Sequence, residues 1–214
     1  MAERFTTLVG VAVPLMRDNI DTDSISPGSR APAVGAKVEF SEKGTSTLAQ
    51  ELFANWRYDN AGHERPDFAL NKPQYRNAKI LITGTNFGCG SSRESAVWML
   101  KEWGIRCILA ISFGEIFWNN CFANGMLPVA LPECTIRELA EEALPGSPNA
   151  LFTVDLFANL LTAPSGRAVD ISLPEFRRRG LLEGLDELAV TLQDIERVEN
   201  FLLRARTTWP WMHQ

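Results

Sequence analysis

The stretch that decides the fold is Lys79-Ile80-Leu81-Ile82-Thr83-Gly84-Thr85-Asn86-Phe87-Gly88-Cys89-Gly90-Ser91-Ser92-Arg93-Glu94. Its first five residues are centred on the apolar run Ile80-Leu81-Ile82, which predicts a buried strand. Three glycines follow within seven residues and predict a tight turn. Apolar residues then recur at i, i+3, i+4 and i+7, which indicates one face of a helix: Ala96, Met99, Leu100 and Trp103. The stretch is therefore a predicted strand–turn–helix unit.

The same alternation of elements continues on both sides of this unit. Strands are predicted at residues 8–15, 107–111 and 126–131. Helices are predicted at 113–124 and at 135–144, the second with Thr135 as its N-cap. A further helix is predicted from the capping box Thr47-x-x-Gln50 through Trp56. Residues 18–32 and 59–73 read as loops. Three short strands at 151–155, 160–163 and 168–171 predict a β-meander. The order predicts an α/β fold with parallel crossovers.

The C-terminal part is predicted to be helical, at residues 174–182 and 186–205. A length of 214 residues fits one domain, and we expect a single domain over 1–214 with a helical extension from about 173 to 214.

Composition limits the classes of function. The formal net charge is −5 and no basic stripe is present, so nucleic-acid binding is not expected. The N-terminus lacks a charged region followed by an apolar one, and no segment is long enough to span a bilayer. We therefore expect a cytoplasmic protein with no membrane partner.

The four cysteines are widely spaced and form no Cys-x-x-Cys motif: Cys89, Cys107, Cys121 and Cys134. This spacing predicts neither a zinc site nor an iron–sulfur site contained in this chain, so no metal ligands are assigned. Buried free thiols are the expected state of these residues.

The glycine-rich turn is the strongest candidate site. It lies where a strand ends and a helix begins, and the backbone of Gly88, Cys89 and Gly90 would approach an anion closely near unpaired helix N–H groups. The Gly-x-Gly-x-x-Gly and Walker A patterns of nucleotide sites are not matched. A structural alternative remains open, because Ser91-x-x-Glu94 is also a capping box.

The string GTNFGCGSSRE at 84–94 resembles the active-site loop of the aconitase superfamily's swivelling domain. Further resemblances are NIDTDSI at 19–25, SFGEIF at 112–117 with Asn119-Asn120, and GLDE at 184–187 with Thr191-Leu192. The last of these is similar to the C-terminus of the family's small subunits. The resemblance implies a swivelling β/β/α domain, with a central, mostly parallel sheet flanked by helices and an additional β region.

The resemblance also implies roles for individual residues. Ser91 would be the catalytic base, Ser92 would help to bind substrate, and Arg93 would hold a substrate carboxylate. Asp23 would orient the reacting hydroxyl or an acid, and Asp21 would shape the loop. From their pattern alone, the two aspartates are also typical turn residues or helix caps.

Two positions depart from the family's pattern. The family's pattern here is Ser-Ser-Arg-Glu-His-Ala, and Ser95 stands in place of its histidine. This difference removes a titratable hydrogen-bonding partner. The loop at 26–32 differs from that of the isopropylmalate branch, and Arg30 is either a solvated side chain or a ligand for a remote substrate carboxylate.

By resemblance, the function is that of a small subunit of isopropylmalate isomerase-type hydro-lyases. Such an enzyme interconverts 2-isopropylmalate and 3-isopropylmalate through isopropylmaleate in leucine synthesis, with a four-iron, four-sulfur cluster in a separate large subunit. A related hydratase acting on methylmalate, dimethylmalate or homoaconitate is an alternative with the same motifs. A non-enzymatic regulatory module is another, which the acidic balance and the intact Ser91-Ser92-Arg93 disfavour.

Overall fold

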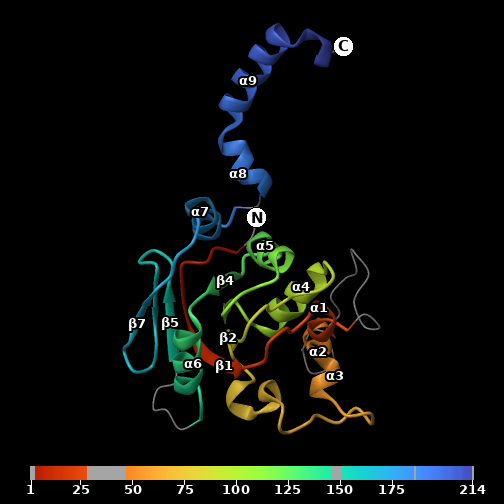
Figure 1. Ribbon diagram of the computed structural model, residues 1–214, viewed down its shortest axis with the longest axis vertical. Coiled ribbons are helices and arrows are strands. Elements are labelled where there is room, and N and C mark those ends of the chain that lie inside the picture. The colour runs from red at the N-terminus through yellow and green to blue at the C-terminus, as the bar shows by residue number, and fades with distance from the viewer. Residues whose placement is uncertain (1–2, 28–46, 146–150, 186, 214) are drawn as a thin grey trace.

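The computed structural model describes residues 3–27, 47–145, 151–185 and 187–213. Within these residues, a seven-stranded sheet runs through the body of the molecule in the order β4-β3-β2-β1-β5-β6-β7 (Figure 1). Its strands are β1 (Thr7–Leu15), β2 (Ile80–Thr83), β3 (Cys107–Ala110), β4 (Leu127–Ala130), β5 (Leu151–Asp155), β6 (Leu160–Thr162) and β7 (Ala168–Asp170).

The sheet has a parallel half and an antiparallel half that meet at β1. Strands β1, β2, β3 and β4 pair in parallel, with Ala12 opposite Ile80 and Ile80 opposite Cys107. On its other edge β1 pairs antiparallel with β5, and β5, β6 and β7 form the predicted meander. The predicted α/β class, with a central parallel sheet and an additional β region, is confirmed.

Helices connect the strands and cover the sheet. They are α1 (Thr22–Ile25), α2 (Thr47–Glu51), α3 (Ala54–Arg57), α4 (Glu94–Trp103), α5 (Glu115–Ala123), α6 (Glu133–Glu142), α7 (Glu175–Glu183), α8 (Glu187–Gln193) and α9 (Ile195–Thr208), with 3₁₀ turns at Ala69–Asn71, Pro73–Tyr75 and Pro210–His213.

Each face of the parallel strands belongs to a different hydrophobic core. Ile80 and Ile82 of β2 point into one core together with residues of α6, whereas Leu81 points into the other with residues of α4. All four residues of β2 and all four of β3 are buried. This burial on both faces explains why these strands are continuous apolar runs rather than alternating ones.

Several predicted boundaries were wrong, each for a local reason. The helix expected through Trp56 is broken at Phe53, whose left-handed backbone (φ 50°) separates α2 from α3. The loop expected from residue 18 contains one helical turn, α1, capped by Asp21. Helix α6 begins at Glu133 after Pro132, so Thr135 is inside the helix and not its N-cap.

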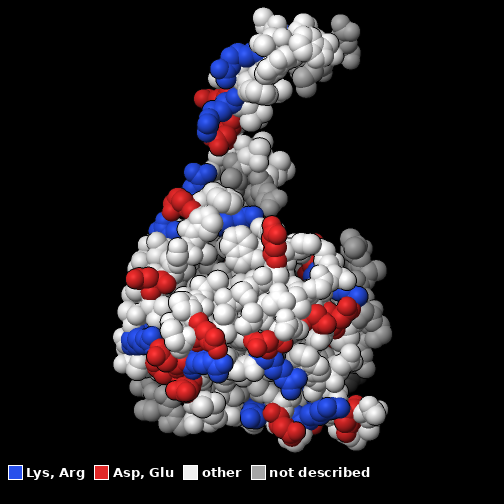
Figure 2. Space-filling view, in the orientation of Figure 1, with Lys and Arg blue, Asp and Glu red and all other residues white. Residues whose placement is uncertain are grey.

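The C-terminal helices extend away from the body of the molecule (Figure 1). The single helix predicted at 186–205 is two helices, α8 and α9, interrupted at Asp194. Charged side chains gather along one side of this extension and uncharged ones along the other (Figure 2). Among the helices that the structure describes, none has the length and apolar character needed to cross a membrane.

Candidate active site

The glycine-rich turn is held in place because its glycines lie against other parts of the chain. A Cβ on Gly88 would come within 2.2 Å of the Phe117 side chain, and Gly88 has a left-handed backbone with φ +73°. A Cβ on Gly84 would lie 2.2 Å from Asp18 Oδ1. Only glycine fits at these two positions without displacement of neighbouring atoms. The need for glycine at these two positions therefore comes from packing within this chain.

The segment that contains α1 runs alongside the turn. The backbone N–H of Thr22 donates to the carbonyl of Cys89 (2.9 Å), and the Thr22 hydroxyl donates to the carbonyl of Ser91 (2.7 Å). The N–H of Gly88 donates to the carbonyl of Ile20 (2.7 Å). The predicted Asp-Thr-Asp segment and the predicted serine–arginine segment, about 70 residues apart in sequence, are therefore neighbours in space.

Asp21 and Asp23 have different surroundings within α1. Asp21 is the N-cap of α1, and its carboxylate accepts a hydrogen bond from the N–H of Ser24 (2.6 Å). Asp23 forms an ion pair with Arg93, with Oδ1 and Nη2 2.6 Å apart. Asp21 thus shapes the segment while Asp23 faces the turn.

Ser91 and Ser92 are exposed and lie just before α4. The first helical residue is Glu94, the N-cap is Arg93, and no side chain caps this helix start. The capping box Ser91-x-x-Glu94 is therefore not formed, because Ser91 lies two residues before the N-cap and Glu94 is at the first helical position instead of the third. Within the described part of the chain, the Ser91 hydroxyl neither donates a hydrogen bond to another residue nor accepts one.

The first turn of α4 is tied to two other helices. Glu94 accepts a hydrogen bond from the side-chain amide of Asn124 at the end of α5 (3.1 Å), and Asn124 accepts one from the Trp98 indole (3.1 Å). Ser95 lies 2.9 Å from Ser26, oxygen to oxygen. The start of α4, and Arg93 with it, is thus fixed from both sides.

The cysteines do not assemble into a metal site. Cys107 and Cys121 are buried, and burial raises the pKa of both thiols. Cys89 is half-buried in the turn with a pKa raised by burial and, to a lesser extent, by Asp21. Cys134 is exposed, so the expectation of burial was wrong for this residue. Within the described ranges, no group of three or more His, Cys, Asp or Glu side chains could hold a metal ion.

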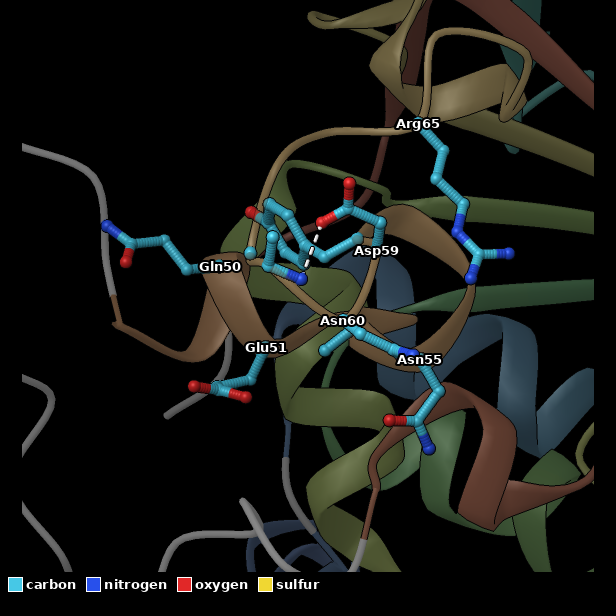
Figure 3. Close-up of a pocket in the computed structure, with 10 residues that line it drawn as sticks. Gln50, Glu51, Asn55, Asp59, Asn60 and Arg65 are labelled. Atoms are coloured by element: carbon cyan, nitrogen blue, oxygen red, sulfur yellow. Dashed lines mark hydrogen bonds between the residues drawn. The ribbon is translucent and has the colours of Figure 1, made fainter.

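A hollow of about 780 Å³ lies beside α2 and α3, apart from the glycine-rich turn. Gln50 and Glu51 stand on one side of it, Arg65 on the other, and Asp59 accepts a hydrogen bond from the N–H of Ala61 between them (Figure 3). Its lining includes no residue of 84–94. The hollow is thus a separate surface feature. Arg30, the other predicted substrate ligand, falls outside the described residues.

Sequence reasoning missed three residues that shape the site. Asp18 accepts a hydrogen bond from the N–H of Thr85 (2.6 Å), Thr22 binds the turn as described, and Ser26 is fully buried beside Ser95. The position of Thr22 between two singled-out aspartates was a usable signal. Asp18 and Ser26 follow no periodicity or motif, and only the contact between distant segments reveals them.

Known proteins are similar to this chain over nearly all of its length. Residues 2–134 match the family model of the aconitase C-terminal domain. The 3-isopropylmalate dehydratase small subunit of Rhodospirillum centenum is 48% identical over 209 residues, covering 98% of each chain. That of Paramagnetospirillum magneticum is 46% identical over 210 residues, covering 98% of this chain and all of its own.

A solved structure has the same fold. The crystal structure of 3-isopropylmalate dehydratase from Methanocaldococcus jannaschii aligns with a TM-score of 0.60 and 21% identity, covering 91% of this chain and 98% of that one. The match to the family model and the full-length similarity to the two small subunits place the chain in the aconitase C-terminal domain family, among the 3-isopropylmalate dehydratase small subunits.

Proposed function

We propose that this chain is the small subunit of a hydro-lyase that interconverts 2-isopropylmalate and 3-isopropylmalate through isopropylmaleate, a step of leucine synthesis. The observation that carries this proposal is the end-to-end similarity to relatives named as small subunits of that enzyme. The adjacency of Ser91, Arg93 and Asp23 gives the proposal a chemical site.

In this proposal Ser91 is the base. Loss of water from 2-isopropylmalate removes a proton from the carbon next to a carboxylate and a hydroxyl from the neighbouring carbon. Ser91 would accept the proton as an alkoxide and return it during rehydration in the opposite orientation. A serine oxygen acts as a base only where N–H groups and a cation stabilise its charge and water is excluded. The N–H groups at the start of α4 and the Arg93 guanidinium are the candidates for that stabilisation.

Arg93 would hold a substrate carboxylate, with Ser92 beside it. A guanidinium presents five N–H donors, and here Nη2 contacts Asp23 and Nη1 donates to the carbonyl of Ser26 (3.4 Å). The remaining donors would be available for a substrate carboxylate, which arginine binds in a two-pronged geometry. Asp23 would orient the reacting hydroxyl or an acid close to it.

The iron–sulfur cluster expected for this enzyme does not fit the described residues of this chain. Two of the four cysteines are buried in the cores, and no three His, Cys, Asp or Glu side chains gather at a metal-binding distance in the part of the chain that the structure describes. We therefore propose that a separate large subunit holds the cluster, which when bound there supplies a Lewis acid for the leaving hydroxyl. Since Ser91 and Ser92 are exposed here, the same subunit would cover them and exclude water.

The proposal is tested by mixing this chain with a large subunit and measuring turnover of a panel of 2-hydroxy diacids. Activity with 2-isopropylmalate, in the mixture and in neither chain alone, is the expected result. Preference for methylmalate, dimethylmalate or homoaconitate would reassign the substrate but keep the assignment of the base to this chain and of the cluster to the large subunit. Separately, this chain alone should bind no stoichiometric cluster after anaerobic reconstitution, as read from its visible absorbance.

A further inference from the structure

Two serine hydroxyls join α1 to α4 next to the proposed carboxylate-binding arginine. Ser26 Oγ and Ser95 Oγ lie 2.9 Å apart, and either can be the donor. Ser26 is fully buried, and Ser95 lies half-buried in the first turn of α4, at the position where the family's pattern has histidine. The pair therefore connects the Asp-Thr-Asp segment to the helix that begins directly after Arg93.

Ser26 also contacts Arg93 through its backbone. The Ser26 carbonyl accepts a hydrogen bond from Arg93 Nη1 (3.4 Å). Pro27 follows Ser26, and a residue before proline is held out of the helical conformation. Ser26 accordingly ends α1 with a non-helical backbone (φ −126°, ψ 87°), and its carbonyl lies within hydrogen-bonding distance of the guanidinium.

We propose that the Ser26–Ser95 hydroxyl pair positions Arg93 for binding of a substrate carboxylate. Ser95 fixes the hydroxyl of Ser26, and the carbonyl of Ser26, together with Asp23, fixes the plane of the guanidinium. The inference rests on the role proposed for Arg93 and adds two positioning residues to it. Both serines are assigned a positioning role that acts through Arg93.

The pair should act as a unit. Removal of one hydroxyl leaves the other without its partner at a buried location, so removal of the second adds little further loss. In the reconstituted enzyme, Ser26→Ala and Ser95→Ala should each raise the KM for the diacid by about threefold to tenfold, with a smaller change in kcat. The double variant should match the single ones, and Ser95→Thr, which keeps a hydroxyl, should restore the KM.

Tyr75→Phe is the matched control. It removes one buried hydroxyl, which donates to the carbonyl of Ala143 (2.8 Å) and not to Ser26, Ser95 or Arg93. It should lower the melting temperature as the serine variants do and leave the KM unchanged. If Ser26→Ala and Ser95→Ala behave like Tyr75→Phe, or if their effects on KM multiply in the double variant, the pair has only a structural role and the proposal is wrong.

A second readout on the isolated chain separates this proposal from the proposed function. Nuclear magnetic resonance of the Arg93 guanidinium reports its mobility without substrate or partner. Ser95→Ala should increase that mobility, whereas Tyr75→Phe should not. Equal mobility in the wild type and Ser95→Ala would overturn the positioning role. A wild-type mixture that turns over no diacid would instead overturn the proposed function and leave the mobility result to decide the positioning role.

Discussion

Asp23 Oδ1 lies 2.6 Å from Arg93 Nη2, joining the N-terminal segment to the start of α4. The Asp23 side chain is 54% exposed and that of Arg93 is 29% exposed, so solvent screens the pair and its contribution to stability is about 1 kcal/mol or less. A pair of this kind is a poor stabiliser of the fold. Its importance would lie in orienting the guanidinium and in placing a carboxylate at the proposed reaction centre.

Asp23→Asn should therefore impair catalysis more than stability. In the reconstituted enzyme we expect kcat to fall by roughly 100-fold, because removal of a general acid or base typically lowers a rate by about that factor or more. The melting temperature of the isolated chain should change little, which thermal unfolding would check. A lower KM with an unchanged kcat would show instead that Asp23 only competes with the substrate carboxylate for Arg93.

Arg93→Lys keeps the charge but loses the planar fork. We expect the KM to rise and kcat to fall together, by about tenfold or more in kcat/KM, for every diacid that the enzyme accepts. Arg106→Lys is the control, because Arg106 forms an ion pair with Glu3 and contacts the carbonyl of Gly125 away from the turn. Equal kinetic effects of the two substitutions would argue against a carboxylate site at Arg93.

Gly88→Ala should destabilise the fold, and Gly62→Ala provides the comparison. Both glycines have a left-handed backbone, at φ +73° and +84°, but only at Gly88 does an added Cβ meet another group, the Phe117 ring. The conformational cost is common to both, whereas overpacking adds about 1–3 kcal/mol at Gly88. Urea unfolding of the two variants measures the difference. A similar loss of unfolding free energy in both variants would mean that the Phe117 ring moves aside at no energetic cost.

We propose that the body folds independently of the C-terminal extension. Among the described side chains from Leu188 onward, Ala205 is the one that is buried, and α9 makes its main contacts with the 3₁₀ turn at Pro210–His213. A chain ending after Leu185 should therefore keep a cooperative thermal transition within a few degrees of the full-length value. A loss of cooperativity would show that the extension is part of the folding unit.

The regular elements of the body were predictable because their sequence patterns arise from burial. The runs at 80–83 and 107–110 are buried on both faces, and the helix at 94–103 repeats its apolar residues every three to four positions. The break at Phe53 was not predictable, because an apolar residue carries no turn signature, whereas Asp194 is of a residue type favoured at helix starts. The backbone at Phe53, which is fully buried, is determined by tertiary packing rather than by local preference.

The candidate site was predictable in part. The residues of the turn were identified by resemblance, whereas the ion pair between Asp23 and Arg93 was not predicted and is seen only in the structure. The bond between Ser26 and Ser95 could not be inferred, because a lone serine in a loop carries no signal and the two are 69 residues apart. Arg30 remains a prediction from sequence.

The measurement that tests the account most directly compares Ser91→Ala with the wild type in the enzyme reconstituted with a large subunit. Removal of the base should lower kcat by about 1,000-fold or more, while the complex still assembles with normal stoichiometry and this chain keeps its melting temperature, because the Ser91 hydroxyl has no hydrogen-bond partner among the described residues. Turnover of 2-isopropylmalate at a near-normal rate by the Ser91→Ala enzyme would contradict the assignment of the base to this chain.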